Sequence, residues 1–116
     1  MLTLYGIKSC DTCRKARKWL DANAIEYRAH DVRVDGLDAK MLERWFAGME
    51  WQKFLNMRSL TWRRIPEVDR SDMNRDKAMG MMLEQPTLIR RPVLEGDDFI
   101  AIGFSPANYA RIFKET

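Results

Sequence analysis

No run of apolar residues in this 116-residue sequence is long enough to span a bilayer, and the first residues lack the basic and apolar regions of a secretory signal peptide. The sequence has one histidine, His30, and two cysteines, Cys10 and Cys13. A closed zinc site needs four ligands, and a secreted disulfide scaffold would use more cysteines. These shortages favour a cytoplasmic protein with no membrane segment and no permanently bound metal or cofactor.

The composition is that of a chain able to bury a core, because 46% of its residues are hydrophobic and 32% are charged. The net charge is +3, and basic and acidic residues are interspersed as on an ordinary solvated surface. Nucleic-acid binding is not required by this balance. The length is that of one domain, residues 1–116.

Alternation of apolar and polar residues predicts strands over residues 2–5 and 25–30, with a helix over 11–22 and a C-cap at Asn23 between them. Such a unit gives parallel strands. After it we expect a helix capped by Asp38 and ending near Gly48, a short helix near residues 51–55, and a methionine-rich helix over 73–84 that Pro86 stops.

Near the C-terminus the pattern predicts a short strand at residues 93–94, a turn at 96–98, a strand over 99–102 and a helix that begins at Ser105-Pro106. The predicted order of elements is a βαβ unit, a helical section over about residues 37–85, and a ββα unit. We therefore predict an α/β thioredoxin-like fold with a helical insertion between its halves.

Cys10 follows the first predicted strand and opens the first predicted helix, in the motif Cys10-Asp11-Thr12-Cys13. Unpaired N–H groups and the positive end of the dipole at a helix N-terminus stabilise a thiolate, so the pKa of Cys10 should fall. Lys8 and Arg14 are placed to help, whereas the Asp11 carboxylate opposes them.

Cys13 lies one helical turn beyond Cys10, so the two side chains share a face and are able to close a disulfide. In that role Cys13 would resolve a mixed disulfide formed at Cys10. The alternative is that Cys13 is a small buried hydrophobic residue, as free cysteines often are.

Two basic segments complete the candidate site. Arg91 could bind a carboxylate or an oxyanion through its planar guanidinium. Pro92 opens a strand and could follow a cis peptide bond. The backbone of this loop could pair with an extended thiol peptide such as glutathione. The alternative for Arg91 is a solvated surface residue. Arg58, Arg63 and Arg64 form a basic cluster around Trp62 that could be an oxyanion site or part of a nucleic-acid surface. For Arg63 and Arg64 the favoured interpretation is a solvated face over a buried Trp62.

Four segments together resemble the arsenate reductase (ArsC) family, in its Spx/YffB branch and most of all its YffB type. They are residues 4–17 (LYGIKSCDTCRKAR), 58–64 (RSLTWRR), 86–93 (PTLIRRPV), and 103–105 (GFS) with Tyr109. The resemblance spans almost the whole chain. It implies the same thioredoxin-like fold, a nucleophilic cysteine at Cys10, an oxyanion-holding arginine at Arg91 and a cis proline at Pro92.

Two departures separate the sequence from arsenate reductases that are coupled to glutaredoxin. Those enzymes have one cysteine in the motif, and they carry a further arginine after the third strand, where residues 95–102 of this chain have none. The resemblance therefore favours a glutathione-linked thiol or disulfide oxidoreductase over a reductase of arsenate. The alternatives are an Spx-like redox-sensing regulator that binds RNA polymerase, and a true arsenate reductase.

The sequence thus predicts Cys10, Cys13 and Arg91 as catalytic residues. The residues predicted to contact the substrate are Lys8, Thr12, Arg58, Arg91 and Pro92. Glutathione is the expected co-substrate, and glutaredoxin a possible protein partner.

Overall fold

The computed structural model describes residues 1–114, which form two compact units. The first unit joins the two ends of the chain, residues 1–35 and residues 91–114. The second unit is Gly36–Arg90. Each unit has its own core, and each is described separately.

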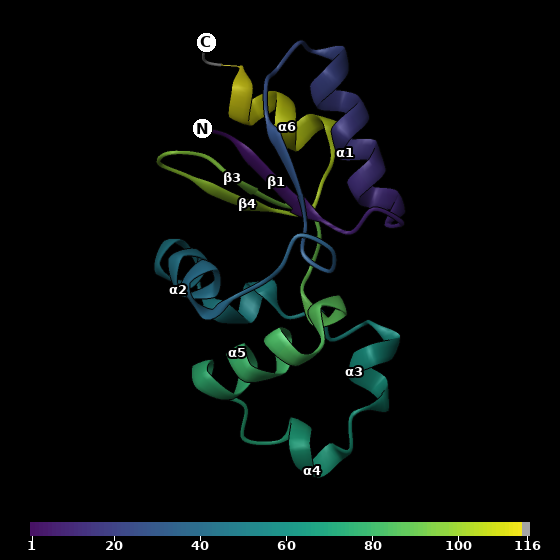
Figure 1. Ribbon diagram of the computed structural model, residues 1–116, viewed down its shortest axis with the longest axis vertical. Coiled ribbons are helices and arrows are strands. Elements are labelled where there is room, and N and C mark those ends of the chain that lie inside the picture. The colour runs from purple at the N-terminus through teal and green to yellow at the C-terminus, as the bar shows by residue number, and fades with distance from the viewer. Residues whose placement is uncertain (115–116) are drawn as a thin grey trace. The chain divides into compact units, whose positions relative to one another are not determined.

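A four-stranded mixed sheet forms the centre of the first unit (Figure 1). Its order is β2 (Arg28–Asp31), β1 (Thr3–Gly6), β3 (Val93–Glu95) and β4 (Ile100–Ile102). β1 runs parallel to β2 and antiparallel to β3, and β3 is antiparallel to β4. This is the predicted βαβ plus ββα arrangement, and the fold is thioredoxin-like.

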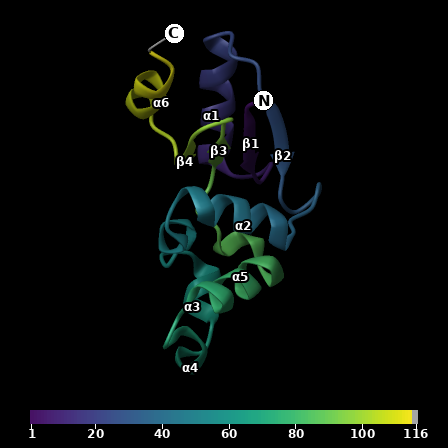
Figure 2. The same cartoon turned by 90° about the vertical axis from the view of Figure 1, so that its left-hand side faces the viewer.

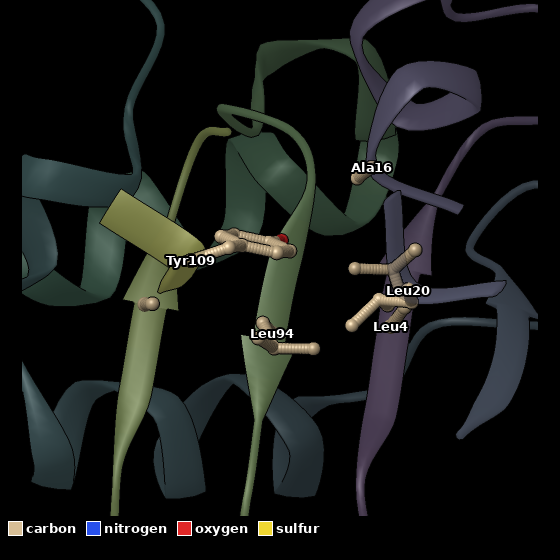
Figure 3. Packing of buried hydrophobic residues seen from close by; sticks show 6 residues of the cluster. Leu4, Ala16, Leu20, Leu94 and Tyr109 are labelled. Carbon is tan, nitrogen blue, oxygen red and sulfur yellow. The ribbon is translucent and has the colours of Figure 1, made fainter. Parts of the chain in front are cut away.

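Two helices, α1 (Asp11–Ala22) and α6 (Pro106–Phe113), pack on one face of this sheet. Leu4, Leu94 and Ala101 are direct cross-strand partners, so they lie on the same face. They form one core with Ala16 and Leu20 of α1 and with Tyr109 of α6 (Figure 3).

Most of the predicted boundaries in this unit are confirmed. α1 covers the predicted range, with Asn23 at its C-cap. Ser105 caps α6 by accepting a hydrogen bond from the Asn108 N–H at 3.1 Å. The turn after β3 is closed by a bond from the Gly96 N–H to the Phe99 carbonyl, 3.0 Å.

The predicted start of the second strand was wrong, because β2 begins at Arg28 and not at residue 25. Residues 24–25, where the strand was expected to begin, belong instead to the C-terminal end of α1. The N–H groups of Ala24 and Ile25 bond to the carbonyls of Asp21 and Leu20, and Ala24 has a φ of 56°. Residues 24–25 thus complete the helix terminus, which apolar alternation alone does not reveal.

The second unit is built mainly of helices (Figure 2), with one isolated antiparallel bridge between Leu55 and Ile89. Its elements are α2 (Ala39–Gly48), η1 (Trp51–Phe54), α3 (Leu60–Arg64), α4 (Glu67–Arg70), α5 (Arg75–Glu84) and η2 (Pro86–Leu88), where η denotes a 3-10 helix. Trp45 and Phe54 stack at 5.7 Å in its core, and Met82 is fully buried. None of the helices among residues 1–114 is long and apolar enough to cross a membrane.

The sequence predicted the long helices of this unit and the short helix near residues 51–55, which is η1, but it did not predict α3, α4 or η2. Asp38 caps α2 as predicted, through the Met41 N–H at 2.9 Å. α5 begins two residues later than predicted, because Asn74 caps it by accepting from the Lys77 N–H. α3 and α4 have five and four residues, too few to show a helical period.

Candidate functional site

Cys10 is the N-cap residue of α1, as the motif predicted. Its backbone is extended, its N–H donates to the Ile7 carbonyl at 2.9 Å, and its carbonyl accepts from the Arg14 N–H at 3.0 Å. The side chain is partly buried and makes no capping hydrogen bond. The sulfur therefore lies at the mouth of the helix, beside N–H groups that have no intrahelical partner.

Strand pairing brings Arg91 to the same place from the other end of the chain. Tyr5 of β1 is paired with Val93 of β3 in antiparallel register, so the residues before β3 lie beside those that follow β1. The peptide bond between Arg91 and Pro92 is cis, as the resemblance implied. The Arg91 guanidinium acts on the Cys10 sulfur through a hydrogen bond and through its charge.

The balance of these surroundings lowers the pKa of the Cys10 thiol. Partial burial is the largest single influence and raises the pKa, but it is outweighed. The backbone N–H and thiol of Cys13 and the Arg91 guanidinium all favour the thiolate, so the pKa lies below its ordinary value. This is the direction predicted from the helix terminus, although the cation that contributes is Arg91 and not Lys8 or Arg14.

Cys13 is completely buried, and burial is the main reason why the pKa of its thiol is raised to about 12. Both cysteines are free thiols. The Cys13 thiol stays protonated and donates a hydrogen bond to the Cys10 sulfur. This hydrogen bond raises the pKa of Cys13 further and lowers that of Cys10. Complete burial of Cys13 agrees with the alternative that it is a small buried hydrophobic residue. Its contact with Cys10 is also compatible with a role in resolving a mixed disulfide at Cys10.

Gly6 is a residue whose contribution sequence reasoning missed. A Cβ at this position would lie 2.6 Å from the Cys13 sulfur, closer than real contacts allow. Only a glycine at the end of β1 lets the buried thiol of α1 pack against the strand. The signal for this packing in the sequence is a glycine between the first strand and the cysteine motif.

Asp11 does not oppose the Cys10 thiolate as a lone charge. Its carboxylate is paired with the Arg14 guanidinium and, at 3.4 Å, with the Lys15 ammonium. Hydrogen bonding to Lys15 is the leading cause of a lowered pKa at Asp11. Arg14 is thus used to neutralise Asp11, which corrects the expectation that it would act on Cys10.

The remaining predicted contact residues are exposed. The Lys8 side chain is in solvent while its backbone N–H donates to Asp31 Oδ2 at 2.8 Å, and Thr12 is exposed in the first turn of α1. Arg58 is an exposed residue of the second unit, and its N–H donates to Asn56 Oδ1. Within residues 1–114, no three metal-ligating side chains lie together.

Arg63 and Arg64 are exposed on α3, whose Trp62 is buried. This is the solvated face over a buried tryptophan that the sequence predicted. The guanidinium that contacts the Trp62 ring comes instead from Arg70, 5.8 Å from the ring centre.

The model of the ArsC family matches residues 5–112. The chain belongs to the ArsC family. A solved structure of a protein named YffB is 43% identical, covering 96% of this chain and 97% of its own, with a TM-score of 0.90. That of an arsenate reductase (ArsC) related protein from Brucella melitensis is 44% identical, covering 97% and 94%, with a TM-score of 0.79.

The family also includes regulators. The global transcriptional regulator Spx of Lactiplantibacillus plantarum is 25% identical over 107 residues, which are 90% of this chain and 80% of that protein. The family recognised from the four sequence segments is therefore confirmed, and it contains both reductase-related proteins and transcriptional regulators.

Proposed function

We propose that the protein is a thiol-disulfide oxidoreductase that works with glutathione, with Cys10 as its nucleophile. The observation that carries this proposal is the convergence of Arg91 and Cys13 on a sulfur at the N-cap of α1, which lowers the pKa of Cys10. A thiolate, not a thiol, is the nucleophile in disulfide exchange, so a lowered pKa supplies more of it at neutral pH.

In the first step the Cys10 thiolate attacks the glutathione sulfur of a mixed disulfide. A Cys10–glutathione disulfide forms and the other thiol leaves as a thiolate. In the second step Cys13 loses its proton and attacks the Cys10 sulfur, which gives the Cys10–Cys13 disulfide and releases glutathione. Two further glutathione molecules would return both cysteines to thiols in a reducing cytoplasm and leave as oxidised glutathione.

Arg91 is the residue best placed to hold the substrate, because its guanidinium lies at the reacting sulfur and is able to bind a carboxylate of glutathione. The backbone around the cis bond before Pro92 offers polar groups to an extended peptide. Lys8, Thr12 and Arg58 remain predictions from the sequence for the rest of the substrate.

Mass spectrometry after exposure to oxidised glutathione tests the proposal. We expect one glutathione adduct on Cys10 that converts to a Cys10–Cys13 disulfide in the wild-type protein. In Cys13→Ser the adduct should persist, because nothing resolves it. Cys10→Ser is the matched control and should stay unmodified, since Cys13 is fully buried. An unmodified Cys10 in the wild-type protein would remove the proposal.

A second candidate is a redox-sensing regulator, favoured by the Spx relative that covers 90% of the chain. Here the Cys10–Cys13 disulfide would be a switch for binding RNA polymerase. A pull-down with RNA polymerase under oxidising and reducing conditions separates the candidates, because an oxidoreductase has no redox-dependent binding to the polymerase.

Arsenate reduction is a third possibility, which the sequence disfavours because no arginine lies in residues 95–102. Turnover of arsenate in the presence of glutathione and glutaredoxin would measure it. We expect none.

A further inference from the structure

An open groove lies between α1 and the outer strand β2, on the helix-covered face of the sheet. Ala29 of β2 is paired with Leu4 of β1, so the two side chains point to the same face. Leu4 is buried there, whereas Ala29 is exposed, because its methyl group does not fill the space beside α1. This space, the α1–β2 groove, has an apolar lining of Leu4, Gly6, Ile7 and Ala29. Its volume of about 360 Å³ is in the range of small-molecule sites.

Two cations border the α1–β2 groove, Lys8 and Arg17 of α1. Within residues 1–114, neither of them is in an ion pair. The two carboxylates that also line the groove are engaged by the backbone. Asp31 accepts from three N–H groups, and Asp35 Oδ2 accepts from the Asp31 N–H at 2.9 Å. The groove therefore complements a ligand that has an apolar body and a carboxylate.

The α1–β2 groove begins at the loop that carries Cys10. The Ile7 carbonyl accepts from the Cys10 N–H at 2.9 Å and closes a turn, whose two ends lie within about 7 Å between Cα atoms. In the sheet, β1 lies between β2 and β3 (Figure 2). Cys10, which follows β1, thus has Arg91 toward β3 and the groove toward β2.

From this arrangement we infer that the α1–β2 groove binds the second half of the mixed disulfide, an organic thiol with an apolar chain and a terminal carboxylate. This substrate class rests on the proposed function, because it concerns the reaction at the same Cys10. Arg91 is the residue proposed to hold glutathione, and the groove lies on the other side of β1, where the second thiol has room. The apolar lining contacts the chain, and Lys8 and Arg17 bind the carboxylate.

The reaction balances in the following way. The Cys10 thiolate bonds to the glutathione sulfur, and the bond between glutathione and the organic thiol breaks. The electron pair of that bond leaves on the organic thiol, which takes a proton from water and dissociates from the groove. Cys13 then displaces glutathione, and two glutathione molecules reduce the Cys10–Cys13 disulfide. The sum converts one mixed disulfide and one glutathione into the free organic thiol and oxidised glutathione.

Competition between two mixed disulfides tests the substrate class. Glutathione is joined to ω-mercaptohexanoate in one of them and to ω-mercaptohexanamide in the other, where a neutral amide replaces the carboxylate. The end group is remote from the sulfur, so the two thiols are equally good leaving groups. The full chain receives both disulfides in equal amount together with reduced glutathione, and chromatography measures the two released thiols above a protein-free sample.

The ratio of the released thiols equals the ratio of the two kcat/KM values, and it does not depend on how much of the protein is folded. We expect the wild-type protein to prefer the carboxylate roughly three- to tenfold at low salt, because two cations face it. The preference should shrink as salt is added.

Arg17→Gln should lower this preference roughly threefold, since it removes one of the two cations. Lys18→Gln is the matched control, because Lys18 is the next residue of α1, is exposed and does not line the groove. Its preference should equal that of the wild-type protein. Ala29→Leu places a larger apolar side chain in the groove and should slow the release of both thiols by roughly fourfold or more. Alkylation of Cys10 by iodoacetamide should be unchanged in this variant, which shows that the nucleophile is intact.

The outcomes separate the substrate class from the proposed function. Absence of protein-dependent release of either thiol overturns the proposed function, and the substrate class with it. Equal release of the two thiols by the wild-type protein overturns the role of the groove and leaves the proposed function standing. The same holds if Arg17→Gln and Lys18→Gln have equal preferences, or if Ala29→Leu releases both thiols at the wild-type rate. A preference that falls in Arg17→Gln alone, with slower release in Ala29→Leu, supports the assignment.

Discussion

At Cys10, influences of opposite sign act on one sulfur atom. Burial disfavours the thiolate, whereas the N–H and thiol of Cys13 and the charge of Arg91 favour it. Because the favourable influences include a cation from a separate segment of the chain, the pKa of Cys10 depends on a residue 81 positions away (91 − 10). The four-residue motif therefore does not by itself determine the pKa of this thiol.

Replacement of Arg91 by glutamine should make Cys10 a poorer nucleophile in mild acid. A lowered pKa keeps the thiolate present to lower pH, so loss of the cation moves the midpoint of alkylation to higher pH. We expect the iodoacetamide alkylation rate at pH 6 to fall roughly three- to tenfold, because the site is partly screened by solvent. Arg90→Gln removes an exposed arginine next to it and should leave the profile unchanged. Equal profiles for all three proteins would contradict the role of Arg91.

Replacement of Gly6 by alanine tests the close approach of β1 to the buried thiol. The new Cβ would lie 2.6 Å from Cys13 Sγ and 3.1 Å from Cys13 Cβ, so α1 or the thiol has to shift. We expect a loss of about 1–3 kcal/mol in the free energy of unfolding, measured with urea. Gly80→Ala is the control, because nothing lies within 4 Å of its added Cβ. On a helix it should stabilise by about 0.5–1 kcal/mol.

Among the elements, α6 contributes to the core of the first unit although it is a short helix. It supplies Tyr109, Ile112 and Phe113 to the core on the helix-covered face of the sheet. Its start is defined by Ser105 and Pro106, a capping residue followed by proline at the first helical position. The placement of Tyr109 against α1 therefore depends on a capping hydrogen bond in a short helix.

Ser105→Ala should lower the free energy of unfolding by about 1 kcal/mol, because the Asn108 N–H loses its acceptor. Ser105→Asp retains an oxygen at the cap and should restore most of that loss. Urea unfolding of the two variants beside the wild-type protein gives the comparison. Equal stability of the alanine and aspartate variants would show that the cap contributes nothing.

The elements also show what local sequence does and does not determine. α1, α6 and the β3–β4 turn follow from periodicity, capping residues and turn residues, all of which act within a few positions. The late start of β2 was missed because Ala24 takes a positive φ, a conformation that alanine rarely adopts and that hydrogen bonds to the end of α1 stabilise. α3 and α4 were missed because four or five residues cannot display a helical period.

For the whole molecule, the fold class was predictable because the order of strands and helices leaves few arrangements. The family followed from four segments spread along the chain. The details of the candidate site did not. The contact of Gly6 with Cys13 and the burial of the Tyr109 hydroxyl depend on tertiary packing, which residue types alone do not specify. The pairing of Asp11 with Arg14 and Lys15 is local, at i,i+3 and i,i+4 spacing in α1.

The overall stability should fall in acid, with Asp31 as one identifiable cause. The Asp31 carboxylate accepts from the N–H groups of Lys8, Arg33 and Val34. Partial burial raises its pKa, but these bonds outweigh it, so the pKa is lowered. A carboxyl group of this kind stabilises the fold above the ordinary aspartate value of about 4, and its contribution disappears as pH falls through the lower folded value.

Urea unfolding from pH 7 to pH 2 measures this dependence. Asp31→Asn should be less stable than the wild-type protein at pH 7, and the difference should shrink toward zero at the acid end. Asp97→Asn is the comparison variant, because it removes an exposed carboxylate that is paired with the amino group of Met1. A difference at Asp31 that stayed constant with pH would contradict the lowered pKa.

The central position of β1 has a consequence for synthesis on the ribosome. β1 is translated well before β3, one of its two neighbours in the sheet, because the two strands lie far apart in the sequence. Until residues 91–95 leave the exit tunnel, β1 remains an open edge and Cys10 has no guanidinium beside it. The candidate site is therefore unassembled in the nascent chain, and a chain that stops before β3 exposes the edge of β1 to aggregation.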